Sequence, residues 1–220
     1  MTSTTIGRPE LIHAYIERLG FHEPDVLARL RVETAPMPNA GMQIAPEQGA
    51  LLGLLVEVIG ARRCLEIGTF TGYSSTAITL AMPADGTLVC CDLSEAFTAI
   101  ARRYWVEAGV AGRVDLRLGP AIETLDAMLA DGAAGTFDLA FVDADKPGYP
   151  GYWARCVELV RPGGLIVLDN MLFHGTVVDP SVHTPEAAAI RETNELIAAD
   201  ERVRHVLLGI ADGMTIALKR

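Results

Sequence analysis

From residue 64 onward, short apolar segments of strand length alternate with amphipathic segments of helix length. The segments that predict strands are 64–67, 87–91, 114–118, 139–142 and 165–168. Those that predict helices between them are 72–81, 95–108, 121–130 and 149–160. Strands separated by helices in this way pair in parallel through right-handed crossovers. The alternation therefore predicts an α/β fold with a Rossmann-like, doubly wound sheet.

The last part of the chain departs from this alternation. A helix predicted at 185–199 is followed by two strands, 203–208 and 214–218, with no helix between them. We expect these strands to form an antiparallel hairpin that turns at residues 211–213. With this hairpin the predicted sheet has seven strands, and its C-terminal part is antiparallel instead of parallel.

The first 60 residues are helical in pattern. Residues 9–19 and 23–33 predict two short helices, and a turn-rich stretch follows them. Pro46 suits the first turn of a third helix that runs to residue 59. The sequence has no internal repeat and no linker, so residues 1–220 predict a single domain.

Composition and charge exclude several classes of protein. Half of the residues are hydrophobic and 21% are charged, which is typical of a globular chain. The net charge is −10 and the basic residues cluster only in pairs, which argues against a nucleic-acid partner. The longest apolar run, 50–56, is far shorter than the ~20 residues of a membrane span. Residues 1–10 lack the pattern of a secretory signal.

The four cysteines indicate a reducing compartment. Cys64, Cys90, Cys91 and Cys156 form no C-x-x-C pair, and three of them lie in strand-like apolar runs. Buried free thiols in the cytoplasm are the plainest interpretation.

A glycine-bearing turn, LEIGTFTGYSS at residues 65–75, joins the first predicted strand to the next helix. Backbone N–H groups in such a turn surround a ligand. Dinucleotide loops read G-x-G-x-x-G, whereas the residue two beyond Gly68 is the bulky Phe70, which argues against NAD or FAD. Asp92 lies 24 positions after Gly68 and is placed to accept hydrogen bonds from a ribose. With Glu66 nearby for a cationic group, the loop favours S-adenosylmethionine, although a structural α/β turn is the alternative.

Two later strand ends carry oxygen ligands. Asp143 ends the stretch FVD, and Asp169 and Asn170 follow the strand at 165–168. Two carboxylates, an amide oxygen and water suit Mg²⁺, or another divalent cation such as Mn²⁺ or Ca²⁺, and leave positions for a substrate. The absence of His and Cys beside them argues against zinc. Taken singly, each residue has a structural alternative, such as a turn at Asn170.

Lys146 lies three residues after Asp143 and is a candidate general base. A neighbouring dication disfavours the ammonium form, so the lysine can accept a proton from a substrate hydroxyl. Its structural alternative is a surface lysine that pairs with Asp145, which itself is placed to cap the next helix.

At these residues the chain resembles the cation-dependent O-methyltransferases related to the catechol and caffeoyl-CoA enzymes. The resemblance covers nearly the whole chain from about residue 36. The matching stretches are LEIGTFTGYSS (65–75), CDLS (91–94), GPA (119–121), FVDADK (141–146), DN-x-L-x-x-G (169–175) and DGMTIALKR (212–220). The resemblance implies the class I methyltransferase fold and a metal-dependent transfer of a methyl group from S-adenosylmethionine to a hydroxyl group.

The resemblance also implies roles for individual residues. It places the cation on Asp143, Asp169 and Asn170, and the base at Lys146. For the cofactor it points to Met42, Glu66, Gly68, Thr69, Ser74, Asp92, Ala121 and Asp143. It makes a homodimer plausible, and it suggests that residues 1–35 form a helical cap over the substrate pocket or a partner subunit.

The acceptor stays open at the level of sequence. Where plant coenzyme A enzymes have tryptophan and asparagine, this chain has Phe173 and His174. The loop at 173–184 should form one wall of the pocket, with His174 and His183 as candidate substrate contacts or as solvated loop histidines. Catechols, other phenols and hydroxylated natural products all fit as small-molecule acceptors.

Three other functions are alternatives. A tRNA hydroxyuridine O-methyltransferase is disfavoured by the acidic charge. A catalytically inactive module that binds S-adenosylmethionine is disfavoured by the intact Asp143, Lys146, Asp169 and Asn170. An NAD-dependent oxidoreductase is disfavoured by Phe70.

Overall fold

The computed structural model describes Thr5, Gly7 and residues 9–220. These residues form a seven-stranded sheet with the strand order β3-β2-β1-β4-β5-β7-β6. The strands are β1 (Arg63–Ile67), β2 (Thr87–Asp92), β3 (Val114–Leu118), β4 (Phe137–Val142), β5 (Val160–Leu168), β6 (Val203–Leu208) and β7 (Met214–Lys219). The first five are parallel, and β7 is antiparallel to both β5 and β6. The predicted α/β fold with a reversed C-terminal hairpin is therefore confirmed.

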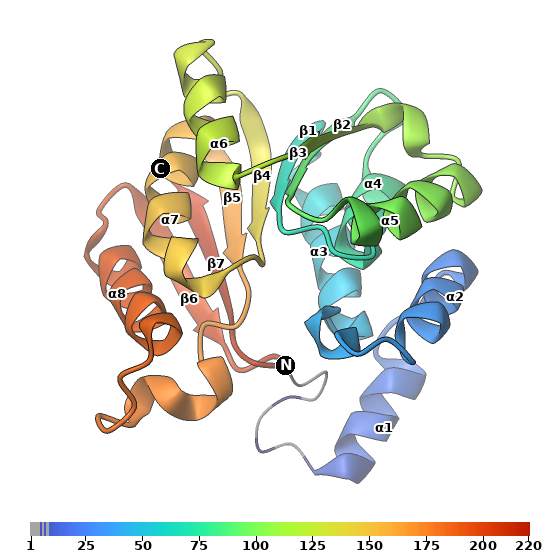
Figure 1. The fold of residues 1–220 in the computed structure, drawn as a ribbon, viewed down its shortest axis with the longest axis horizontal. Coiled ribbons are helices and arrows are strands. Elements are labelled where there is room, and N and C mark those ends of the chain that lie inside the picture. The colour runs from blue at the N-terminus through green and yellow to red at the C-terminus, as the bar shows by residue number, and fades with distance from the viewer. Residues whose placement is uncertain (1–4, 6, 8) are drawn as a thin grey trace.

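Helices cover both faces of this sheet (Figure 1). One face carries α6 (Ala121–Ala130), α7 (Tyr149–Leu159) and α8 (Pro185–Ala199). The other carries α3 (Pro46–Val58), α4 (Tyr73–Ala81) and α5 (Glu95–Glu107). This second layer is extended by α2 (Asp25–Thr34), which packs against α4 and α5.

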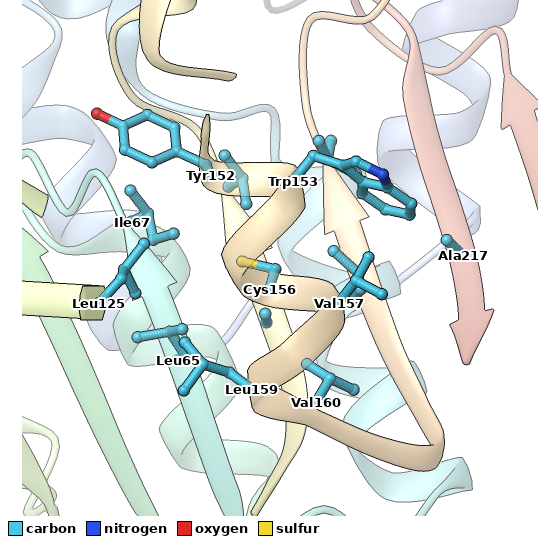
Figure 2. Packing of buried hydrophobic residues seen from close by; sticks show 14 of the residues in the cluster. Leu65, Ile67, Leu125, Tyr152, Trp153, Cys156, Val157, Leu159, Val160 and Ala217 are labelled. Atoms are coloured by element: carbon cyan, nitrogen blue, oxygen red, sulfur yellow. The ribbon is translucent and has the colours of Figure 1, made fainter. Parts of the chain in front are cut away.

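Each face has its own hydrophobic core. Figure 2 shows part of the first core, in which Trp153, Cys156 and Val157 of α7 pack toward the strands beneath them. Alternate residues of each strand supply the two cores: Leu65 and Ile67 belong to one, and Cys64 belongs to the other. Because both faces are buried, the central strands are mostly apolar, which is why they are recognisable in the sequence. All four cysteines are free and buried, as the sequence predicts.

Most predicted elements agree with the structure to within one or two residues, and β5 differs most. The sequence predicts a strand only at 165–168, whereas β5 begins at Val160, directly after α7. Pro162, Gly163 and Gly164 resemble a turn in the sequence but lie within the strand. A shift of register opposite them, between Phe137 and Leu139 of β4, accommodates the irregular segment as a bulge does.

The N-terminal segment consists of two unlike helices. Leu27 and Leu30 of α2 are buried in the second core. In contrast, α1 (Glu10–Leu19) has no buried residue and lies at the periphery of the molecule (Figure 1). Part of the predicted cap lies outside the described residues, namely residues 1–4, 6 and 8. The same residues make up most of the segment 1–10 that was compared with a secretory signal.

No helix among residues 9–220 combines the length and the apolar character that crossing a membrane requires.

Candidate active site

A cavity of about 700 Å³ opens where the parallel strands β1, β2 and β4 end. In a doubly wound sheet this edge, near the point where the strand order reverses, is the usual place for a ligand. Seven of the eight residues predicted for the cofactor line the cavity: Met42, Gly68, Thr69, Ser74, Asp92, Ala121 and Asp143. The structure thus brings together residues that are up to 101 positions apart in the chain (42 to 143).

Gly68 lets the loop after β1 approach the end of β4. Its φ is +91°, and a Cβ at this position would lie 2.1 Å from the carbonyl oxygen of Asp143. No side chain fits in that distance, so only glycine allows the cofactor loop and the predicted metal ligand to lie against one another.

Asp92 stabilises the same loop through hydrogen bonds to its backbone. Its Oδ2 accepts hydrogen bonds from the backbone N–H groups of Thr69 (2.8 Å) and Phe70 (2.9 Å), and its Oδ1 accepts one from Ser94 N (2.7 Å). Phe70 needs this support because its φ of +50° is unusual for a bulky residue. Asp92 therefore shapes the loop as well as facing the cavity, and the sequence prediction assigned it only the second task.

Glu66, the eighth predicted residue, does not line the cavity. It is completely buried beneath the loop, next to Cys90 of β2, whose thiol lies 3.4 Å from Glu66 Oε2. Burial raises the pKa of the Glu66 carboxyl to about 7, and the neighbouring hydroxyls of Ser74 and Thr69 lower it in part. Any effect of Glu66 on a cationic cofactor must therefore act through the loop from the buried side.

Residues N-terminal to the sheet also line the cavity. Met42, Gln43 and Ile44 line it, and Gln43 donates hydrogen bonds from Nε2 to Thr34 Oγ1 and Thr71 Oγ1, both at 3.2 Å. Of these three wall residues the sequence prediction named only Met42. No local pattern marks Gln43, because its partners are contributed by α2 and by the glycine loop.

The three predicted metal ligands lie at the ends of the adjacent strands β4 and β5. Asp169 and Asn170 are each 3% exposed. Asn170 has a φ of +59°, and its Oδ1 is buried without a hydrogen-bond partner among the described residues. An unpaired buried amide oxygen costs free energy unless a ligand satisfies it, and a hard cation is such a ligand.

The charges of this cluster also suit a cation. Burial, together with the nearby carboxylate of Asp143, raises the pKa of Asp169 to about 7. Two buried carboxylates that repel one another are stabilised by a positive ion between them. The residues present therefore fit a divalent cation bound by oxygen. Among the described residues, no group of three or more His, Cys, Asp or Glu side chains could hold a metal, and the predicted set contains only two carboxylates beside its amide.

Lys146 lies beside this cluster and is 6% exposed. Its Nζ is 3.0 Å from Asp143 Oδ1 and 2.8 Å from the hydroxyl oxygen of Tyr149, and it lies over the Tyr149 ring. The lysine pairs with Asp143 and not with Asp145. Asp145 instead caps the following turn, where Oδ2 accepts a hydrogen bond from Gly148 N, as its structural alternative predicts.

The loop after Asn170 begins with the 3-10 helix η4 (Phe173–Val178). His174 is held by buried Asp212, whose Oδ1 accepts a hydrogen bond from His174 N (2.6 Å) and whose Oδ2 lies 3.5 Å from His174 Nδ1. His183 is exposed. The two histidines therefore differ, since only the ring of His174 faces a partner from another element.

The model of the family described as O-methyltransferase matches residues 17–220. This chain belongs to the O-methyltransferase family. The predicted resemblance to the catechol and caffeoyl-CoA enzymes is thus confirmed at the level of family, and the chain is a member of the S-adenosylmethionine-dependent O-methyltransferases.

Individual relatives cover most of this O-methyltransferase. The mouse (Mus musculus) catechol O-methyltransferase domain-containing protein 1 is 40% identical over 205 residues, which are 93% of this chain and 78% of the relative. Caffeoyl-CoA O-methyltransferase 1 of Eucalyptus globulus is 39% identical over 88% of this chain and 81% of its own length. Among solved structures, the O-methyltransferase TomG of Streptomyces achromogenes, in complex with S-adenosylmethionine, is 34% identical with a TM-score of 0.85, covering 95% of this chain and 96% of TomG.

Proposed function

We propose that this chain is a Mg²⁺-dependent O-methyltransferase that transfers the methyl group of S-adenosylmethionine to a hydroxyl of a catechol-like, phenolic or related natural-product acceptor. One observation carries the proposal. Lys146 Nζ lies 3.0 Å from Asp143, which lines the cofactor cavity, while Asp169 and the unpaired Asn170 Oδ1 are buried at the neighbouring strand end. A base, a set of oxygen ligands and a cofactor cavity thus meet at one edge of the sheet.

The residues present divide the chemistry between them. Asp143, Asp169 and Asn170 would hold the cation, which when bound lowers the pKa of an acceptor hydroxyl and orients its oxygens. Lys146 would take the proton from that hydroxyl, and the Tyr149 hydroxyl, which accepts a hydrogen bond from Nζ at 2.8 Å, holds the amine in place. Asp143 lines the cofactor cavity and also contacts Lys146, so it would align the acceptor with the methyl donor.

The cofactor cavity fits S-adenosylmethionine better than a dinucleotide. Phe70 takes the place of the glycine that lets a pyrophosphate approach, and its backbone is held by Asp92. The relatives named for catechol and caffeoyl-CoA support a phenolic acceptor.

We also propose that the protein is a cytoplasmic homodimer in which residues 1–35 cover the acceptor pocket or the partner subunit. The described part of that segment supports a covering role, because Leu11, Tyr15 and Leu19 of α1 are exposed. The molar mass in solution, measured by light scattering for the full chain and for a chain that lacks residues 1–20, tests this assembly.

The function is tested by methyl transfer to caffeic acid with and without EDTA, followed by addition of Mg²⁺. We expect EDTA to abolish turnover and Mg²⁺ to restore it, and we expect Asp143→Ala and Asp169→Ala each to abolish it. Asp126→Ala is the matched control, because Asp126 is an exposed carboxylate that pairs with Arg155 and does not line the cavity. Full turnover in EDTA, or in either active-site variant, would contradict the proposal.

A further inference from the structure

Gln48 connects the first core helix to the proposed metal site. It lies in the first turn of α3, is 1% exposed and is separated from Asp169 by 121 positions in the chain. Its Nε2 donates a hydrogen bond to Asp169 Oδ1 at 2.7 Å, and its Oε1 accepts one from Ala45 N at 2.8 Å. Because one end of the amide accepts from a backbone N–H and the other donates to a carboxylate, the orientation of this side chain is determined.

The two hydrogen bonds that reach the Asp169 carboxylate go to the same oxygen. Oδ1 accepts from Gln48 Nε2 and from Asn170 N, the latter at 2.7 Å. The described residues make no hydrogen bond to Oδ2. Gln48 and Asn170 N therefore restrain one oxygen of the carboxylate and leave the other for a ligand of another kind.

The neutrality of Gln48 matters as much as its hydrogen bond. With both carboxylates ionised, as they would be when they bind a cation, the formal charges of Asp143, Asp169 and Lys146 sum to −1, which attracts a cation. An arginine or lysine in place of Gln48 would supply a second positive charge and remove that attraction. An amide donates to the carboxylate without neutralising it.

We propose that Gln48 is a positioning residue of the metal site: it holds Oδ1 of Asp169, leaves Oδ2 for a cation and adds no positive charge to the cluster. The inference rests on the proposed metal dependence. Partners that orient a metal ligand in this way change metal affinity by about 10- to 100-fold when they are removed.

The test measures Mn²⁺ affinity of the whole chain, from the electron paramagnetic resonance signal of free Mn²⁺, without cofactor or acceptor. Gln48→Met keeps the volume of the side chain and loses the donor, and we expect it to weaken Mn²⁺ binding by about 10- to 100-fold. Gln48→Lys keeps a donor and adds charge, and we expect it to weaken binding further. Thr79→Val is the matched control, because Thr79 is a fully buried helix residue that donates a hydrogen bond to Ser75 O and does not line the cavity, and the Mn²⁺ affinity of this variant should equal that of the wild type.

A purely structural role for Gln48 as a cap of α3 would lower the melting temperature in both Gln48 variants and leave Mn²⁺ affinity unchanged. Mn²⁺ binding within twofold of the wild type in a folded Gln48→Met or Gln48→Lys chain would overturn the inference. Asp169→Asn separates this failure from that of the proposed function. If the wild type and Asp169→Asn bind Mn²⁺ equally poorly, the metal site itself is wrong, whereas loss only in Asp169→Asn leaves the site intact and removes the role of Gln48.

Discussion

Glu66 makes the stability of the free protein depend on pH. Burial raises its pKa from 4.5 to about 7, while the unfolded chain keeps the ordinary value. Between these two pH values the folded chain holds a proton that the unfolded chain has released. Glu66 therefore contributes stability that is fully present below pH 4.5 and is lost as the pH rises through 7.

The size of this loss follows from the difference in pKa. Each pKa unit corresponds to about 1.4 kcal/mol, so the total change for Glu66 is roughly 3 kcal/mol. About 2 kcal/mol of it should occur between pH 5.5 and pH 8. Glu66→Gln removes the titrating group and keeps its shape, so the free energy of unfolding of this variant should fall by about 2 kcal/mol less over that interval.

The measurement is urea unfolding at pH 5.5 and pH 8 for the wild type and Glu66→Gln, both without cofactor. Other buried acids, Asp169 among them, titrate in both proteins, so their effects cancel in the comparison. Glu123→Gln, a substitution of an exposed glutamate in α6, is the control and should behave as the wild type does. If the free energy of unfolding changes between pH 5.5 and pH 8 by the same amount in Glu66→Gln and in the wild type, to within about 0.5 kcal/mol, the reasoning is refuted.

Two further predictions concern the geometry of the site. Tyr149→Phe removes the hydroxyl that accepts a hydrogen bond from Lys146 Nζ and lies 3.1 Å from the backbone oxygen of Asp169. We expect kcat to fall roughly tenfold with little change in KM, which is a fraction of the rate that a general base contributes. An unchanged kcat in steady-state assays would contradict this. Gly68→Ala would place a Cβ 2.1 Å from the Asp143 carbonyl oxygen at a φ of +91°, so it should lower the free energy of unfolding by about 3 kcal/mol and abolish cofactor binding by calorimetry. A stable Gly68→Ala chain with normal cofactor affinity would show that the loop does not need this close approach.

Local patterns in the sequence are enough to predict the sheet. Segments 114–118 and 203–208 are recognisable because their composition and the segments that flank them favour strands. Their predicted bounds agree with those of β3 and β6. The convergence of Asp143 with Asp169 and Asn170 also follows from sequence, because parallel strands in one sheet end at the same edge. The irregular start of β5 does not follow, since glycine and proline at 162–164 indicate a turn locally and only pairing with β4 draws them into the sheet.

The sequence alone therefore determined the fold class, the edge of the sheet that carries the site, and the residue types that meet there. Only the tertiary structure decided how these residues are held. The bond from Gln48 to Asp169, the contact of Gln43 with Thr34 and Thr71, and the burial of Glu66 below the loop all depend on where helices dock on the sheet. A local pattern records the preferences of a residue and its near neighbours, whereas such contacts join segments that only the packed core brings within hydrogen-bond distance.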